Sequence, residues 1–156
     1  MTTLKKRTVL YSFMTIVLLL VSLAPTRQAE AGQDGNTLYK RLGGYDAVVA
    51  VVDDFIARLA SDKQISRFLV GLSTDSKKRL RQLVIDQFCL ATGGPCLYTG
   101  RDMKTSHAGL GITESEWDSA AKHLVASLNK FKVPKKEQDE LIAIVSSLKG
   151  DIVEKK

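Results

Sequence analysis

Apolar residues recur at the helical period along most of this chain, and no stretch of useful length alternates apolar and polar residues. In residues 46–59 the stripe consists of Val48, Val52, Phe55, Ile56 and Leu59. Spacings of three and four residues place such side chains on one face of a helix, whereas a half-buried strand needs a period of two. The sequence therefore predicts an all-α fold.

Three further segments carry the same period, and local signals mark where they begin. The stripes are Leu80, Val84, Gln87, Phe88 and Ala91 in residues 77–92, then Trp117, Ala121, Leu124, Leu128 and Phe131, and last Leu141, Val145, Leu148 and Ile152. Asp46 is the expected N-cap of the first helix, and a polar loop at 73–76 precedes the second. Thr113 and Glu116 form a capping box, and Pro134 is expected in the first turn of the last helix. Shorter helical pieces are expected at 37–42, 65–69 and 103–107.

The connection between the second and third main helices is long and has little regular pattern. Gly93-Gly94-Pro95 ends the second helix, and the next main helix begins only at Thr113, with a single helical turn expected between them at 103–107. A connection of this kind is unusual in a compact domain unless a ligand or a function holds it. His107 stands near its end, before Gly109 and Gly111, and an imidazole is a good axial ligand for haem iron. A single histidine is weak evidence, because most histidines lie at the surface or are satisfied in the core.

The charge of the chain does not point to nucleic acid. The formal net charge is +6, and about half of this excess lies in residues 1–31. What remains is typical of an ordinary solvated surface, so a nucleic-acid partner is not expected. With 156 residues, the chain is long enough for one domain.

Residues 1–31 have the three parts of a secretory signal peptide. Lys5-Lys6-Arg7 precede an apolar run over 8–25, and Ala29-Glu30-Ala31 follow it. We therefore expect cleavage after Ala31, a mature domain over 32–156, and export, which in a bacterium means the periplasm. Contact with a membrane is expected only through this segment. The alternative is an uncleaved anchor formed by residues 8–25.

Cys89 and Cys96 are the only cysteines. An even number in an exported chain favours a disulfide, and the turn between them can bring their Cα atoms close enough. The alternative is a pair of buried thiols. A Cys-x-x-Cys-His motif for covalent haem attachment is missing from the sequence, and the spacing of cysteine and histidine serves zinc poorly.

Residues 37–153 resemble a group I truncated haemoglobin. The segments that carry the resemblance are Leu38-Tyr39-Lys40-Arg41-Leu42-Gly43-Gly44, Val51-Val52-Asp53-Asp54-Phe55, Gly93-Gly94-Pro95, Tyr98-Thr99-Gly100, Met103-Lys104 and His107-Ala108-Gly109-Leu110-Gly111-Ile112-Thr113. The resemblance implies a two-over-two helical sandwich around haem b, with His107 as the proximal ligand of the iron. It implies that the haem-binding residues include Phe55, Ile56, Phe68, Leu80, Val84, Gln87, Phe88, Tyr98, Met103 and His107. His123 is interpreted as structural.

The chain departs from the family on the distal side. Many members carry a tyrosine and a glutamine that donate hydrogen bonds to O₂, and here those positions hold Ile56 and Val84. Gln87, one turn after Val84, is the remaining polar residue on that helical face. The sequence contains no histidine near the distal helix, so a bis-histidyl iron is not expected unless His123 or a chain end supplies the second ligand.

Four functions are compatible with these observations. The first is a protein that reversibly binds O₂, NO or CO. The second is an NO dioxygenase, which needs firmly held O₂ and a reductase as a partner, so the missing tyrosine argues against it. The third is a haem-based redox or haem-shuttling protein of the periplasm. The fourth is a helical interaction domain without a cofactor, which an absorption spectrum would separate from the others.

Overall fold

The computed structural model describes residues 35–155, so the predicted signal peptide at 1–31 and its cleavage after Ala31 lie outside the described part. The helices are α1 (Leu38–Arg41), α2 (Gly44–Ser61), the 3₁₀ turn η1 (Ser66–Phe68), α3 (Thr74–Ala91), α4 (Met103–His107), α5 (Glu114–Lys130), α6 (Lys135–Ser146) and α7 (Lys149–Ile152). Within 35–155 the only β-type pairing is an isolated parallel bridge between Thr113 and Lys155. The all-α prediction is confirmed.

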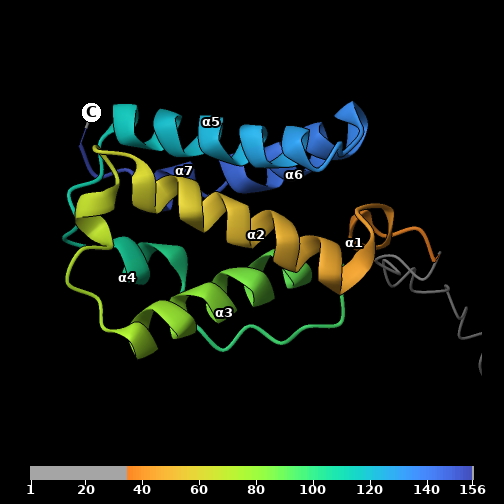
Figure 1. Cartoon of the computed structure of the whole chain (residues 1–156), viewed down its shortest axis with the longest axis horizontal. Helices are drawn as coiled ribbons and strands as arrows, with labels where there is room; N and C mark the ends of the chain where they lie inside the picture. The colour runs from red at the N-terminus through yellow and green to blue at the C-terminus, as the bar shows by residue number, and fades with distance from the viewer. Residues whose placement is uncertain (1–34, 156) are drawn as a thin grey trace, which may run out of the picture. The chain divides into compact units, whose positions relative to one another are not determined.

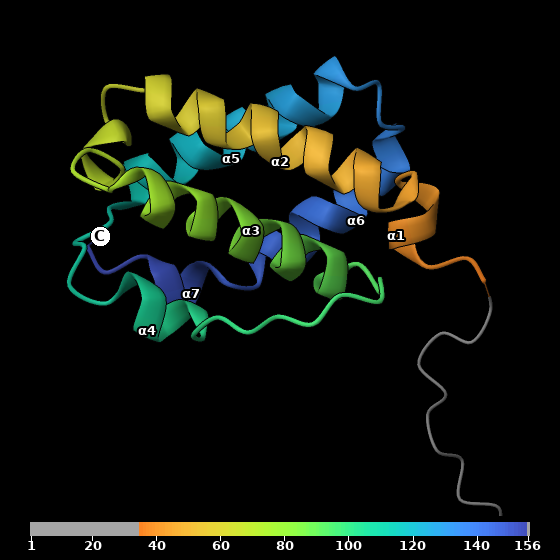
Figure 2. The ribbon, with the colours of Figure 1, turned by 60° about the horizontal axis from the view of Figure 1, so that its bottom comes forward.

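The long helices form two packed pairs. α2 lies between α3 and α5, while α6 runs beside α5 and also contacts α1 (Figure 1). Turning the molecule brings α4 and α7 forward, where they lie next to each other below α3 (Figure 2). α2 and α3 are thus stacked against α5 and α6, and the short helices α4 and α7 close one end.

Two helices begin earlier than the sequence predicted. α2 starts at Gly44 with Gly43 as its N-cap, so the expected cap, Asp46, lies inside the first turn. α3 starts at Thr74, because the Ser73 hydroxyl accepts a hydrogen bond from the Ser76 N–H. The predicted polar loop at 73–76 is therefore the capped first turn of a helix. Polar residues near a helix start resemble a loop until the capping bond is recognised.

The C-terminal stripe is divided between two helices, where one was predicted. α6 ends at Ser146, and α7 begins at Lys149. Pro134 lies at the N-cap of α6, one position before the predicted first turn. The capping box was predicted correctly: Thr113 accepts from the Glu116 N–H, and the Glu116 carboxylate accepts from the Thr113 N–H.

Two apolar clusters hold the helices together. One consists of the buried residues Leu38, Val51, Leu124, Leu128 and Leu141, from α1, α2, α5 and α6. The other consists of Val48, Val52 and Ile85, where α2 meets α3. The partly buried ring of Phe88 packs against both clusters, so α3 contributes to each.

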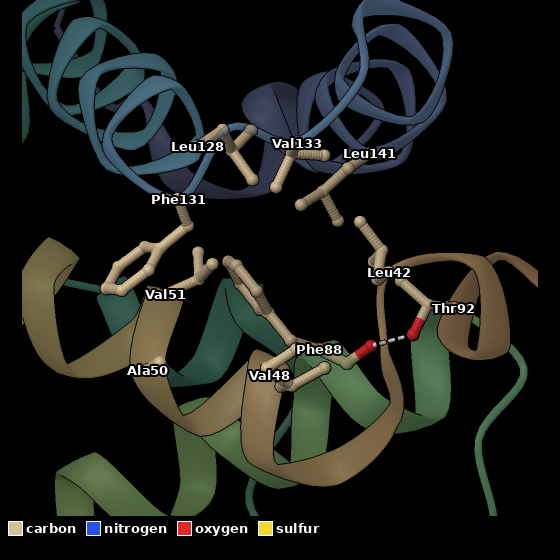
Figure 3. A pocket seen from close by; sticks show the side chains of 11 residues that line it. Leu42, Val48, Ala50, Val51, Phe88, Thr92, Leu128, Phe131, Val133 and Leu141 are labelled. Carbon is tan, nitrogen blue, oxygen red and sulfur yellow. Dashed lines mark hydrogen bonds between the residues drawn. The ribbon is translucent and has the colours of Figure 1, made fainter.

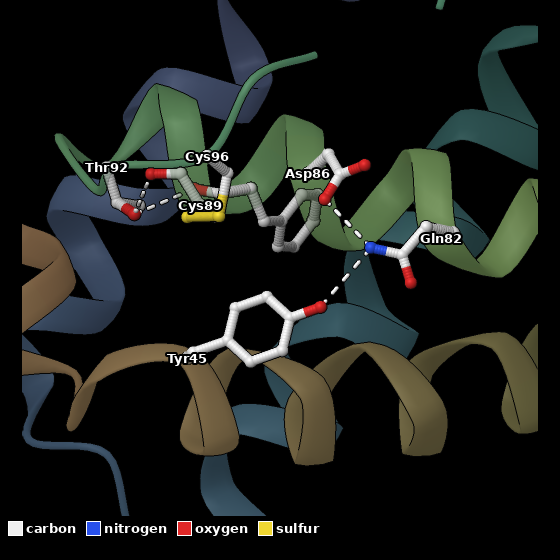
Figure 4. Close-up of a disulfide and its surroundings, with 7 residues drawn as sticks. Tyr45, Gln82, Asp86, Cys89, Thr92 and Cys96 are labelled. Atoms are coloured by element: carbon white, nitrogen blue, oxygen red, sulfur yellow. Dashed lines mark hydrogen bonds between the residues drawn. A yellow bond between two sulfur atoms is a disulfide. The ribbon is translucent and has the colours of Figure 1, made fainter. Parts of the chain in front are cut away.

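The predicted disulfide is present. Cys89, near the end of α3, is bonded to Cys96 in the following connection, with a Cα–Cα distance of 5.7 Å (Figure 4). Gly94 lies between them because a Cβ there would fall 2.7 Å from the Cys89 sulfur and 2.6 Å from the Tyr39 ring. The bridge ties the start of the irregular connection to the end of α3.

The helices of residues 35–155 include none that is long and apolar enough to cross a membrane.

Candidate functional site

A largely apolar cavity of about 410 Å³ lies among α2, α3, α4, α5 and the C-terminal helices. Its volume is within the ~300–1,000 Å³ of small-molecule and cofactor sites. All ten residues that the sequence assigned to the haem line this cavity: Phe55, Ile56, Phe68, Leu80, Val84, Gln87, Phe88, Tyr98, Met103 and His107. Segments far apart in the sequence therefore meet where the resemblance placed them, and their roles as haem contacts stay predictions.

The sequence analysis did not assign the rest of the wall to the site. The further lining residues are Leu59, Ile65, Leu69, Leu72, Leu83, Ser106, Leu110, Ile112, Glu116, Trp117, Ala120, Ala121, Leu124, Val145, Leu148 and Ile152. Several belong to the apolar stripes of the third and fourth predicted helices. The signal was therefore present, but a stripe does not say whether it faces a core or a cavity.

His107 is fixed by a hydrogen bond within its own short helix. Its Nδ1 atom lies 2.8 Å from the carbonyl oxygen of Met103. Because a carbonyl oxygen only accepts, Nδ1 must carry the proton, and the lone pair of the neutral ring is on Nε2. Within residues 35–155, Nε2 takes part in no hydrogen bond. An imidazole in this tautomer is ready to bind a metal through Nε2.

Capping positions the helix that carries His107. The Asp102 carboxylate accepts from the Thr105 N–H at 2.7 Å and from the Thr105 hydroxyl at 2.9 Å. Both bonds lower the pKa of Asp102, and the bond from the backbone N–H of Thr105 has the larger effect. The ionised side chain also sits favourably at the positive end of the helix. α4 is short, and this cap defines where it starts.

Tyr98 approaches the cavity from the irregular connection. Its hydroxyl donates to the Arg101 carbonyl at 2.6 Å, and its ring lies so close to Gly100 that a Cβ there would fall 2.2 Å from the hydroxyl. The glycine lets the aromatic ring fold back over the chain, and the ring then forms part of the cavity wall.

The wall formed by α2 and α3 is almost entirely apolar. Ile56, Leu80 and Val84 line it, and Gln87 is its one polar side chain. In the described part of the chain, the Gln87 amide makes no hydrogen bond to protein. A half-buried amide of this kind is free to serve a ligand in the cavity or a water beside it.

An ion pair and a hydrogen bond connect η1 to the start of α5 beside the cavity. Glu116 accepts from Arg67 at 2.8 Å and from the Thr113 N–H at 2.9 Å. The hydrogen bond from the Thr113 N–H lowers the pKa of Glu116 most, and the hydrogen bond from Arg67 to Glu116 lowers it further. The guanidinium of Arg67 also stacks on the Phe68 ring, 3.9 Å from its centroid. These contacts join three segments of the wall.

His123 does not line the cavity. Its Nε2 atom lies 2.7 Å from an Asp62 carboxylate oxygen, which also accepts from the Ser119 hydroxyl at 2.7 Å. Asp62 follows the end of α2, so the histidine links α5 to that end. This arrangement agrees with the structural interpretation of His123.

A second, smaller cavity of about 180 Å³ lies between α2, α5 and α6. Its wall includes Val51, Leu128 and Leu141, and Phe88 lines both cavities (Figure 3). The rings of Phe88 and Phe55 lie with their centroids 6.4 Å apart. Phe88 is thus part of the partition between the two spaces.

The residues present fit a haem better than a metal ion alone. No group of three or more histidine, cysteine, aspartate or glutamate side chains that could hold a metal ion exists within 35–155. A haem needs from the protein an apolar slot and one axial donor, because the porphyrin supplies the other four bonds to the iron. The cavity and the free Nε2 of His107 meet those two needs.

Known proteins with similar sequences are globins. The bacterial-like globin family matches residues 37–154. The chain is 35% identical over 130 residues to the group 1 truncated hemoglobin GlbN of Mycolicibacterium paratuberculosis, covering 83% of this chain and 90% of the relative. It is 34% identical over 119 residues to the group 1 truncated hemoglobin GlbN of a Synechocystis species, and the match covers 74% of this chain and 90% of that relative.

Solved structures agree in fold. The 2/2 hemoglobin of a Synechococcus species superposes with a TM-score of 0.69 at 29% identity, covering 76% of this chain and 98% of that one. A truncated hemoglobin of Tetrahymena pyriformis superposes with a TM-score of 0.70 at 24% identity, and the match covers 76% of this chain and 98% of that one.

The fold and the cavity define a helical haem protein of the globin class. The chain belongs to the bacterial-like globin family, among relatives named group 1 truncated hemoglobins. It binds haem, and like other globins it binds a diatomic gas.

Proposed function

We propose that this globin binds O₂ reversibly at a haem b whose iron is held by Nε2 of His107. The observation that carries the proposal is the hydrogen bond from Nδ1 of His107 to the Met103 carbonyl, which leaves the Nε2 lone pair free. The cavity residues would hold the macrocycle by excluding water from its apolar faces. When bound, the haem supplies an iron whose open side takes the gas.

Absorption spectra of the purified protein test this proposal. We expect ferric, ferrous and ferrous-CO spectra of a b-type haem with one histidine ligand, and an oxygenated form that returns to the ferrous form when O₂ is removed. A protein purified after haem supplementation that shows no Soret band would overturn it. A ferrous form with two axial protein ligands that O₂ does not displace would also overturn it, because the gas would then have no open site.

We propose O₂ binding rather than NO dioxygenation because of the wall that α2 and α3 form. Efficient dioxygenation needs firmly held O₂, and here Ile56 and Val84 provide no hydrogen-bond donor, which leaves Gln87 alone. Repeated consumption of NO by the oxygenated protein, with an external reductase supplied, would instead support the enzyme. A single stoichiometric reaction with NO would not.

We also propose that the globin works outside the cytoplasm, after cleavage at Ala31. Two observations support this: the tripartite pattern of residues 1–31, and the bridge between Cys89 and Cys96, since disulfides persist in oxidising compartments. Intact mass of the protein from a periplasmic extract is expected to correspond to a chain that begins at Gly32. Recovery of the uncleaved chain in the membrane fraction would favour the anchor at 8–25.

A further inference from the structure

The turn that follows His107 is held by the C-terminal end of the chain. The backbone N–H of Gly109 donates to Oε1 of Glu154 at 2.7 Å, and the N–H of Gly111 donates to Oε2 at 2.5 Å. One carboxylate therefore receives two backbone N–H groups from the segment between α4 and α5. We call this pair of bonds, between Glu154 and the two glycines, the C-terminal clamp.

The backbone shape of the turn makes the clamp possible. Gly109 and Gly111 have φ values of 80° and 64°, in the left-handed region that glycine favours. Their amide N–H groups are thus outside any helix and point to one side, a concave arrangement that binds anions. The two N–H groups, that of Gly109 first, lower the pKa of the Glu154 carboxyl.

Backbone bonds fix the clamp in place. The N–H of Glu154 donates to the Ile112 carbonyl at 2.9 Å, and the N–H of Glu114 donates to the Lys155 carbonyl at 3.2 Å. The segment 112–114, which leads into α5, and the C-terminal residues 154–155 thus run beside each other for a short distance, as the bridge between Thr113 and Lys155 shows. Glu154 is presented to the glycines from a defined backbone position, which reduces the entropy lost on making both bonds.

Both partners of the C-terminal clamp lie close in sequence to residues of the haem cavity. Gly109 is two residues after His107, and the N–H of Leu110 donates to the His107 carbonyl at 3.2 Å. On the other side, Ile152 lines the haem cavity two residues before Glu154. α4 and α7, which carry His107 and Ile152, are in contact (Figure 2). A single carboxylate therefore joins the turn that ends the histidine helix to a segment of the cavity wall.

We propose that Glu154 is a positioning residue for His107, holding the histidine helix at the depth and angle that its imidazole needs to reach the iron. This inference rests on the proposed role of His107 as the iron ligand. Glu154 is not among the residues that line the cavity, so its effect passes through the turn at Gly109 and Gly111. The residue type is required because only a carboxylate offers two acceptor oxygens and no donor.

Glu154→Gln in the full-length holoprotein tests the proposal. The amide keeps the length of the side chain but replaces one acceptor with a donor, so one glycine N–H loses its partner. We expect the iron–histidine stretching band of the ferrous protein to shift or broaden, and haem transfer to an acceptor apoglobin to accelerate about tenfold. Hydrogen exchange at Gly109 and Gly111 is expected to rise in both holoprotein and apoprotein.

Glu114→Gln is the matched control. Glu114 forms an ion pair with Lys149 and so also joins α5 to α7, whereas the N–H groups of Gly109 and Gly111 donate to Glu154. We expect the control to leave the iron–histidine band and the rate of haem transfer unchanged. Glu154→Asp, which keeps the charge on a shorter side chain, is expected to give a partial effect and serves if the glutamine variant does not fold.

The outcomes separate this inference from the function it rests on. An iron–histidine band missing from the parent protein would refute the role of His107, while the exchange data would still report on the clamp. If the band is present and Glu154→Gln loosens the two glycine amides without moving the band or the rate of haem loss, the positioning role is refuted. Equal effects of Glu114→Gln would refute it too, because any contact that docks the C-terminus would then suffice.

Discussion

His107 donates from Nδ1 to the carbonyl oxygen of Met103, four residues earlier on the same short helix, over 2.8 Å. This bond decides which nitrogen faces the cavity. It also makes the backbone of α4 the partner that a ligating imidazole usually has on its far side. The orientation of the ring within α4 is therefore set by the histidine's own helix. The position of that helix in the molecule is a separate matter, which the proposal for Glu154 concerns.

His107→Ala should abolish the iron–histidine band of the ferrous protein and much of the bound haem, because the iron loses its one protein ligand. Resonance Raman spectra and the ratio of the Soret to the protein absorbance measure this. His123→Ala is the control: His123 is bonded to Asp62 outside the cavity, so the spectrum should not change. An unchanged iron–histidine band in His107→Ala would refute the assignment.

Gln87→Leu should accelerate O₂ dissociation about fivefold, because loss of one hydrogen bond of about 1 kcal/mol changes a rate by that factor. The C–O stretch of the CO complex should shift toward that of an apolar pocket. Ile56→Tyr should slow dissociation by adding a donor on α2. Stopped-flow measurements give both rates.

The control for Gln87→Leu lies five residues earlier, on another face of α3. Gln82 donates to Asp86 and to the Tyr45 hydroxyl, away from the cavity (Figure 4), so Gln82→Leu should leave O₂ dissociation unchanged. If Gln87→Leu does not alter O₂ dissociation but accelerates haem loss, the amide serves the macrocycle and not the gas.

Replacing Cys89 and Cys96 with serine should lower the free energy of unfolding by about 2–3 kcal/mol, the chain entropy that so short a closed loop removes from the unfolded state. The difference between the urea midpoints of the parent and the double variant measures it. The parent isolated without reductant should also be lighter than its reduced form by two hydrogens. Two thiols that alkylate freely in that sample would show that the bridge does not form.

Asp62→Asn should remove part of the acid sensitivity of the fold. The pKa of Asp62 is lowered from 3.8 to about 2. The hydrogen bond from Ser119 has the largest effect, followed by those from His123 and the Gln64 N–H. A lowered pKa in the folded state contributes stability that is present above the unfolded value and is lost as the pH falls through the folded value. The contribution of Asp62 should therefore fade between about pH 4 and pH 2.

Urea midpoints measured across this range test the assignment. The parent should lose stability more steeply with falling pH than Asp62→Asn, and the variant should already be the weaker at neutral pH. Parallel pH profiles would mean that Asp62 does not titrate with the fold.

Much of this architecture follows from sequence patterns. The period of the stripes predicted most of the side chains that turn inward, although Phe131 and Ala91, the last members of two stripes, are exposed. Thr113 with Glu116 marked the start of α5 to the residue. The start of α3 was missed because Ser73, the capping residue, lies in a polar run that also fits a loop. The break between α6 and α7 was missed because Leu148 and Ile152 continue the apolar stripe without interruption.

The site was predicted in a similarly uneven way. The family resemblance located the residues of α2, α3 and α4 that surround the cavity. Short motifs include those of α4 and Phe55 of α2, whereas those of α3 follow from their spacing before Gly93-Gly94. The sequence places glycines at 109 and 111 directly after His107, but their bonds to Glu154 were not foreseen. A contact between residues more than forty positions apart leaves no periodic trace in a single sequence.

The bridge between Cys89 and Cys96 spans a sequence separation of seven residues. Closing a loop this short costs little chain entropy, so the two sulfur atoms can meet even while the chain is unfolded. Once formed, the covalent bond does not depend on the packing of the helices. An oxidised chain that has lost its haem and its helical packing therefore still holds the start of the connection that leads to His107 beside the end of α3.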